Sequence, residues 1–248
     1  MSEETAEHAL TVDGGQPAVV PADAPTQPAR RALDQMSILR EAIRFIDEQS
    51  VQNLTMRRLG ARLGVEAMAL YRYVPGREQL LDGVVEVVMD DLYSDTMQQA
   101  DMSKSWTEYL QRMGHGVRKL ALTHPHVFPL VATRPPSAPW LRPPLRSLRW
   151  VEAFLEGLIH HGFDGPSSVR VYRAFSTFLL GHLLLETSTL GGEMGLSVED
   201  DTEFVESNDL SNYPMVTEFS ELLSKDAYED EFEESLEDLL ERLAPLHP

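Results

Sequence analysis

A cluster of arginines is the clearest chemical feature of this sequence. Between residues 55 and 77 the chain has one acid, Glu66, and five arginines, Arg57, Arg58, Arg62, Arg72 and Arg77, so the segment carries a local charge of +4. Guanidinium groups bind phosphate oxygens, and the hydroxyls of Thr55, Tyr71 and Tyr73 can donate hydrogen bonds to such oxygens. These residue types indicate a surface that binds a phosphate backbone.

The formal net charge of −19 does not oppose this interpretation, because the acids lie elsewhere. Residues 1–33 carry five acids and two bases, residues 34–192 carry seventeen of each, and residues 193–248 carry eighteen acids and two bases. Exposed charges further apart than a Debye length of about 8 Å scarcely interact at physiological ionic strength. A local basic surface can therefore bind phosphate although the whole chain is acidic.

Missing residues and motifs exclude several function classes. The sequence has no cysteine, which rules out disulfides, thiolate metal sites and a cysteine nucleophile. It has no G-x-S-x-G motif, no glycine-rich phosphate loop and no H-E-x-x-H motif. The pairs His124/His126 and His160/His161 are more typical of ordinary structural histidines than of a metal site. No uncharged apolar stretch reaches 18 residues, and the acidic N-terminus does not resemble a signal peptide. We expect a cytoplasmic protein that is not an enzyme and has no metal, cofactor or membrane partner.

Helical periodicity predicts an all-α fold, because apolar residues recur at helical spacing and strand-like alternation is missing. We expect an N-terminal three-helix helix-turn-helix domain, joined by a long helix to a C-terminal helical domain for ligand binding and dimerisation. The boundaries are a disordered arm at 1–33, a helix-turn-helix domain at 34–80 and a C-terminal domain at 81–248, with a mobile acidic loop at 191–214. The expected helices span about 35–49, 56–63, 66–72, a long segment from Arg77, a segment from Trp106 to His124, then 145–161, 167–189, 215–225 and 228–244; residues 126–133 are expected to be a link.

The arginines lie within a helix, a glycine turn and a second short helix. Thr55 is placed to cap the first helix, Gly64 permits the tight turn, and Arg77 begins the long helix. In a helix-turn-helix the second helix enters the major groove of DNA. This layout predicts double-stranded DNA as a partner.

The run LTMRRLGARLGVEAMALYRYVPGREQLL, residues 54–81, resembles the DNA-binding domain of the tetracycline-repressor (TetR/AcrR) family. The resemblance implies that Arg57 contacts a guanine, and Arg58 or Arg72 is a further candidate for a base contact. It also implies that Ala67, Met68 and Ala69 face the groove, and that Thr55, Tyr71, Tyr73 and Arg77 hold phosphates. Ala67, Met68 and Ala69 have no hydrogen-bonding side chain, so they can contact thymine methyl groups but few base edges.

Three departures from the family pattern lie nearby. Ser50 stands where the family usually has glycine, Tyr73 replaces the commoner histidine, and Pro75-Gly76-Arg77 replaces a more usual Asn-Lys or Asp-Lys pair. Further along, Leu130 and Leu185 stand where tetracycline repressors place a metal-binding His and Glu. The resemblance therefore does not extend to a magnesium–tetracycline effector.

The C-terminal half predicts a small-molecule effector and a homodimer. Aromatic and polarisable residues on the predicted helices are candidates for a pocket that holds a largely apolar effector, although the same residues equally fit a plain core: Met113, Phe128, Trp150, Phe154, Phe178 and His182. A narrow apolar stripe on an otherwise acidic last helix, together with the helix at 167–189, predicts the dimer contact: Leu179, Leu236, Leu240 and Leu243.

We therefore expect a ligand-responsive homodimeric repressor that binds a palindromic operator. The alternative is a helical interaction or adaptor protein that acts through its acidic C-terminus and has a weak or vestigial DNA-binding surface. Arg30 and Arg31, just before the first helix, are candidates for an arm that enters the DNA minor groove, or they solvate a linker.

Overall fold

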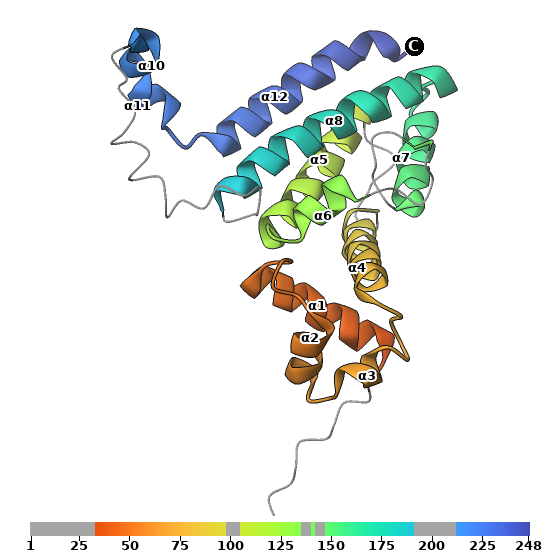
Figure 1. Ribbon diagram of the computed structural model, residues 1–248. Coiled ribbons are helices and arrows are strands. Elements are labelled where there is room, and N and C mark those ends of the chain that lie inside the picture. Colours follow the sequence, from red (N-terminus) through yellow and green to blue (C-terminus); the bar gives the residue numbers. More distant parts are fainter. Residues whose placement is uncertain (1–32, 98–104, 135–139, 142–146, 191–211) are drawn as a thin grey trace, which may run out of the picture. The chain divides into compact units, whose positions relative to one another are not determined.

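The computed structural model describes residues 33–97, 105–134, 140–141, 147–190 and 212–248. Every regular element in these ranges is a helix, as the sequence predicts (Figure 1). The helices are α1 (Gln35–Gln49), α2 (Met56–Leu63), α3 (Ala67–Leu70), α4 (Arg77–Met97), α5 (Trp106–Thr123), α6 (Phe128–Thr133), α7 (Leu148–His160), α8 (Gly165–Thr189), α10 (Pro214–Glu218), α11 (Ser220–Leu223) and α12 (Tyr228–Leu243), followed by the 3₁₀ turn η3 (Ala244–Leu246). None of the described helices is long and apolar enough to cross a lipid bilayer.

Helix α1 follows directly from local sequence. Asp34 and Ser37 form a capping box, in which the Asp34 carboxylate accepts from the Ser37 N–H at 2.7 Å and Ser37 Oγ accepts from the Asp34 N–H at 3.1 Å. The apolar residues at helical spacing point inward and are buried: Ile38, Leu39, Ala42, Ile43, Phe45 and Ile46. The helix ends at Ser50, whose φ of 71° is a conformation that glycine adopts more easily.

Helix α4 joins the first three helices to the rest of the described chain. It packs against α1 and also against α5, α6 and α7. The contact with α1 is close, because a Cβ on Gly83 would lie 2.7 Å from Leu39 Cδ2. Residues 33–248 accordingly form one compact unit.

The C-terminal helices pack around α8. Helices α5, α6, α7 and α12 all contact it, and Figure 1 shows α8 and α12 lying side by side. Large aromatic residues fill this core and have almost no exposed surface: Trp150, Phe128, Phe154, Phe175 and Phe232.

The structure differs from the predicted boundaries at several points. Helix α3 is shorter than the predicted 66–72, and 215–225 is divided into α10 and α11. The predicted link at 126–133 contains helix α6, because Pro129 fits the first turn of a helix and Val131 can be buried. Helix α8 begins before residue 167, since the Asp164 carboxylate caps it at Ser167. The arm at 1–33, with Arg30 and Arg31, and the loop at 191–214 lie almost wholly outside the described residues.

Candidate nucleic-acid interface

Helices α2 and α3 and the turn between them form a tightly packed unit. Thr55 Oγ1 caps α2 by accepting from the Arg58 N–H at 3.2 Å, and Gly64 ends the helix with φ 69°. Gly60, which the sequence analysis does not single out, allows the turn to approach α2, because a Cβ there would lie 2.8 Å from the backbone oxygen of Val65. These contacts fix α3 relative to α2.

The residues expected at the DNA surface lie on the accessible side of this unit. Leu70 is fully buried and anchors α3, whereas Met68 on the same helix is 71% exposed. Tyr71 and Tyr73 follow the helix and are 42% and 40% exposed. All ten candidates are exposed or half-buried: Thr55, Arg57, Arg58, Ala67, Met68, Ala69, Tyr71, Arg72, Tyr73 and Arg77. Each of them therefore has surface that a partner could reach.

Arg62 is already neutralised by acids of α1. Its guanidinium lies 2.7 Å from carboxylate oxygens of both Glu41 and Glu48. The hydrogen bond from Arg62 lowers the pKa of the Glu48 carboxyl below its ordinary value. This arginine therefore joins α2 to α1 and adds little to the positive surface.

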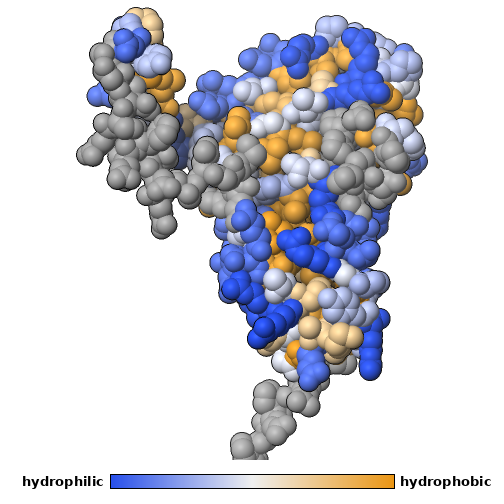
Figure 2. Space-filling view, viewed as in Figure 1, coloured by the Kyte–Doolittle hydropathy of each residue, from blue (hydrophilic) through white to orange (hydrophobic). Residues whose placement is uncertain are grey.

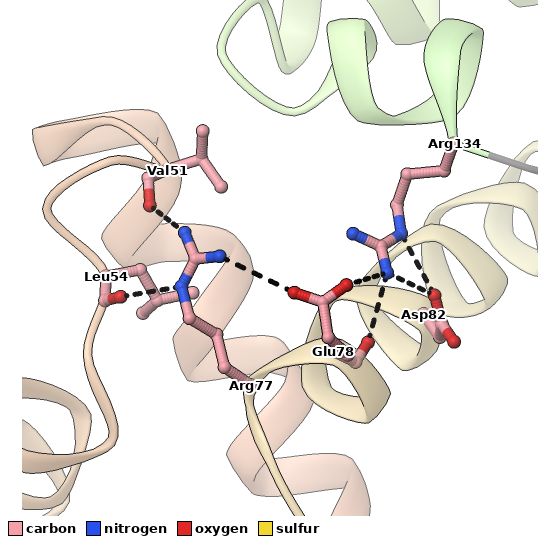
Figure 3. A network of polar contacts seen from close by, with 6 residues as sticks. All are labelled: Val51, Leu54, Arg77, Glu78, Asp82 and Arg134. Carbon is pink, nitrogen blue, oxygen red and sulfur yellow. Dashed lines mark hydrogen bonds and ion pairs between the residues drawn. The ribbon is translucent and has the colours of Figure 1, made fainter.

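Arg58 and Arg77 also have partners within the chain. Arg58 Nη1 lies 3.2 Å from the backbone and the side-chain oxygens of Asn53. Arg77 donates from Nε to the Leu54 carbonyl at 3.2 Å and from Nη2 to the Val51 carbonyl at 2.9 Å (Figure 3). Arg77 thus holds the loop between α1 and α2 against the start of α4.

Arg57 and Arg72 are the two arginines of the cluster that have no hydrogen bond or ion pair with another described residue. Arg57 lines a surface hollow together with Thr55, Arg58 and Ala61. Both guanidinium groups can therefore bind an external phosphate or base without breaking an internal contact.

Ion pairs connect these N-terminal helices to the helices behind them. Arg40 of α1 forms a two-pronged pair with Asp91 of α4, and Asp47 of α1 lies 2.7 Å from Nδ1 of His124. Arg134, which directly follows α6, bonds to two residues in the first part of α4, Asp82 at 2.6 Å and Glu78 at 2.9 Å. Arg77 faces the other side of Glu78 (Figure 3). The position of α1 and of the α1–α2 loop is thus tied to α4, α5 and α6.

The six candidates for the effector pocket divide into two groups. Met113, Phe128, Trp150 and Phe154 are at most 1% exposed and form part of the packed core. Phe178 and His182 lie together on α8 and contact the ring of Phe232, with centroids 5.8 and 5.4 Å apart. The described residues do contain a cavity of about 590 Å³, but it lies between α1, α4 and α5 and none of the six lines it.

The four candidates for the dimer contact are inside the chain's own core. Leu179, Leu236, Leu240 and Leu243 are 2%, 1%, 5% and 4% exposed. Helix α12 packs its apolar stripe on α5 and α8, so these side chains have no free surface for a second chain. The spacing that predicts an interface is explained by packing within one chain.

Metal ligation has no support in the described part of the chain, where no group of three or more His, Asp or Glu residues is placed to hold an ion. His124 and His126 instead bond to the side chain and the backbone oxygen of Asp47.

Comparison with known families agrees with this geometry. The profile for "Tetracyclin repressor-like, C-terminal domain" matches residues 100–245, and the profile for "Bacterial regulatory proteins, tetR family" matches residues 38–84. The chain belongs to the TetR family. Members of the family are transcription regulators with a DNA-binding N-terminal and a ligand-binding C-terminal domain.

Individual TetR proteins share the sequence pattern and the fold. The class A tetracycline repressor from transposon 1721 of Escherichia coli is 27% identical over 169 residues, which cover 67% of this chain and 74% of the relative. The repressor DrrR1 of Streptomyces coeruleorubidus is 30% identical over 112 residues, which cover 45% of this chain and 40% of the relative.

Solved structures extend the likeness over most of the chain. A possible TetR family regulator from Streptomyces coelicolor A3(2) has 25% identity and a TM-score of 0.69, covering 86% of this chain and 100% of that one. ActR of Streptomyces coelicolor, solved in complex with (S)-DNPA, has 21% identity and a TM-score of 0.64, covering 87% and 98%.

Proposed function

We propose that this TetR-family protein is a homodimeric repressor that binds a palindromic operator and is released by a small molecule. The observation that carries the proposal is the accessible face of α2 and α3, where Arg57, Arg72 and Met68 are exposed. Gly60 allows the two helices to approach closely, and Gly64 ends α2. Two such faces in a dimer would enter successive major grooves about 34–36 Å apart. In our proposal the DNA-binding unit spans 34–80 and the effector-binding and dimerisation unit spans 81–248.

Within this proposal the residues have separate roles. Arg57 and Arg72 contribute the charge-assisted contacts, because no described residue neutralises them. Thr55, Tyr71 and Tyr73 donate to phosphates, which positions the helices but carries no sequence information. Ala67, Met68 and Ala69 contact thymine methyl groups, so we expect operators whose central positions are rich in A·T pairs. Arg58 and Arg77 act mainly by holding the Asn53 and Val51–Leu54 backbone in place.

We place the effector in the 590 Å³ cavity between α1, α4 and α5. Its volume lies in the range of about 300–1,000 Å³ that is usual for small-molecule sites. An effector that binds better to the form whose recognition helices are wrongly spaced would shift the population away from DNA. Helix α4 is the lever in this proposal, because it contacts both α1 and α5.

We place the dimer contact on the outward faces of α8 and α12. Thr177, Gly181 and Leu185 recur every four residues on the exposed side of α8, and Leu185 is 59% exposed. Small residues allow a second helix to approach closely, and covering Leu185 removes apolar surface from water. The exposed Arg170 and Arg173 of α8 complement the acidic outer face of α12 in a second chain.

The decisive experiment recovers the DNA that the purified protein binds from genomic fragments and sequences it. We expect an inverted repeat whose half-sites are one helical turn, or a multiple of it, apart. Arg57→Ala should abolish the enrichment, whereas Arg149→Ala, on α7, should not. Recovery of random fragments by the wild-type protein would contradict the proposal.

A second candidate function is binding of another protein through the acidic C-terminal part. Helices α10 and α11 have no buried residue, and Figure 2 shows apolar side chains at the surface of this segment. Its large exposed hydrophobic residues are Tyr213, Met215, Val216, Phe219, Leu222 and Leu223. A gel shift at two salt concentrations separates the two candidates, because a DNA-binding regulator retains a sequence-specific complex at the higher salt.

A further inference from the structure

Met68 is the one long side chain that helix α3 presents to solvent. The helix has four residues, of which Leu70 is fully buried and anchors it. Ala67 and Ala69 are half-buried and end at Cβ, whereas Met68 is 71% exposed. Met68 is therefore the most exposed residue of the helix that we place in the major groove.

Exposure separates Met68 from the other methionines whose side chains the structure describes. Three of these are buried: Met56, Met89 and Met113. Met36 and Met215 are 52% and 57% exposed, less than Met68. An oxidant must reach the sulfur of a methionine to react with it, so we expect a dissolved oxidant to modify Met68 before the others.

The chain offers no thiol that would react in place of a methionine, because it has no cysteine. When a thioether meets hydrogen peroxide, the sulfur attacks one of the two oxygens, so that an S–O bond forms and the O–O bond breaks. The sulfur loses two electrons, the second oxygen leaves as water, and the product is methionine sulfoxide. The modification can be reversed, because methionine sulfoxide reductases restore the thioether.

A sulfoxide at Met68 does not suit the groove contact that we propose for this residue. Its oxygen is a hydrogen-bond acceptor, but thymine presents a methyl group and an acceptor oxygen in the major groove, and neither donates a hydrogen bond. Ala67 and Ala69 have no side-chain donor either. The sulfoxide oxygen would lose water without gaining a partner, which weakens binding to the specific site.

We propose that Met68 is an oxidation site that switches the DNA-binding surface: a peroxide converts its thioether to the sulfoxide and so releases the protein from its operator. The proposal rests on the function proposed above and adds a form of regulation to the same surface. The fold need not change, because Leu70 and the close approach at Gly60 hold α3 in place.

Peptide mass spectrometry after short exposures to hydrogen peroxide tests the chemical step on the full chain without DNA. We expect the sulfoxide to form faster at Met68 than at Met36 or Met215, and at least about tenfold more slowly at the buried Met113 than at Met68. An operator duplex should protect Met68 and leave the rate at Met215 unchanged. Faster oxidation of Met215 than of Met68, or no protection of Met68 by the operator, would overturn the proposal.

Fluorescence anisotropy with the specific and a random duplex tests the effect on binding. Oxidation of Met68 should weaken binding to the specific duplex about tenfold, the effect of losing much of one buried methionine side chain, and should change random binding little. Methionine sulfoxide reductases for both epimers, with dithiothreitol as the reductant, should restore the specific affinity. Unchanged specific affinity after oxidation of Met68 would overturn the proposal, and so would a loss that reduction does not reverse.

Matched variants assign the effect to this residue. Met68→Leu cannot form the sulfoxide, so the ratio of its operator affinities before and after peroxide should be close to one, whatever its starting affinity. Met215→Leu is the control and should stay as sensitive to peroxide as the wild type. Met68→Gln places a polar group of similar length in the groove and should bind the operator as weakly as the oxidised wild type. Peroxide sensitivity that persists in Met68→Leu would refute the assignment.

The same measurements separate this proposal from the proposed function. Untreated protein that binds no operator sequence would overturn the repressor function, and the regulation with it. Untreated protein that binds an operator equally well before and after oxidation of Met68 would overturn the oxidation switch alone and leave the repressor function intact.

Discussion

The close approach at Gly60 gives the sharpest test of how the DNA-binding unit is held together. A Cβ at this position would lie 2.8 Å from Val65 O, 3.2 Å from the Ala67 nitrogen and 3.4 Å from the Ala67 Cα. All three atoms belong to the backbone of the turn and of α3, so no side chain can rotate away. Gly60→Ala must therefore move α3 away from α2 by several tenths of an ångström.

Two opposing effects set the size of the change. Overpacking of this kind costs about 1–3 kcal/mol, and the better helix propensity of alanine returns about 0.5–1 kcal/mol. We expect a net loss of about 0.5–2 kcal/mol in the free energy of unfolding. Specific DNA binding should fall more than binding to random DNA, because the shift displaces Ala67, Met68 and Ala69, which we place against thymine methyl groups in the groove.

The assay combines urea unfolding with fluorescence anisotropy on the specific and on a random duplex, at a temperature where the variant is fully folded. Gly165→Ala at the start of α8 is the matched control, because its Cβ would meet nothing within 4 Å. Because Pro166 follows it, the added Cβ can lower stability through contact with the proline ring, but the control should keep full DNA affinity. Wild-type stability together with wild-type specific binding in Gly60→Ala would refute the argument that this glycine positions α3.

Three further predictions follow from particular side chains. Arg57→Ala should lose about 1–3 kcal/mol of binding free energy on the specific duplex and little on random DNA. Arg77→Ala should weaken binding to both duplexes and lower the Tm. Equal losses for the two variants on both duplexes would contradict their separate roles. Ser50→Gly should stabilise the fold by about 1 kcal/mol in urea unfolding, because it relieves a residue at φ 71° and ψ 154°; a destabilised variant would mean that the serine side chain matters more than the strain. Burial, together with the charges of the neighbouring histidines, lowers the pKa of His161, so the folded state favours the neutral ring. The neutral ring therefore stabilises the folded state fully at a pH above about 6.5, the ordinary pKa of histidine, and this stabilisation is lost as the pH falls below that value. His161→Gln should flatten this acid-side loss of Tm, and an unchanged pH profile would show that other groups cause it.

Local sequence determines most of the helices and the elements of the DNA-binding surface. Asp34 caps α1, Thr55 caps α2 and Gly64 ends it, and each of these acts on backbone groups within a few residues. Apolar periodicity likewise predicts which face of α1 is buried, because the period of a helix fixes which residues share a side. The ten residues expected at the DNA surface are exposed or half-buried. Their contacts with DNA remain a prediction.

The sequence does not show which arginines already form ion pairs or hydrogen bonds within the chain. The five arginines between 55 and 77 look equivalent along the chain, yet Arg62 is held by Glu41 and Glu48, residues that lie 21 and 14 positions earlier. Arg77 binds carbonyl groups of the α1–α2 loop, 26 and 23 positions away. Pairs so distant in sequence have no local signal, because only packing of α1 against α2 and α4 brings them together.

The C-terminal half shows the same limit for apolar residues. A leucine stripe on an acidic helix specifies that one face must leave water, but it does not specify what covers that face. In this chain α5 and α8 cover Leu236 and its neighbours, so the stripe is an internal contact. The sequence by itself therefore determines most of the helices, their buried faces and the TetR-type DNA-binding motif, since these depend on local spacing and capping. Only the tertiary structure decides which arginines remain free for DNA, where a cavity opens and which leucines are already covered, because each of these depends on residues that are far apart in the chain.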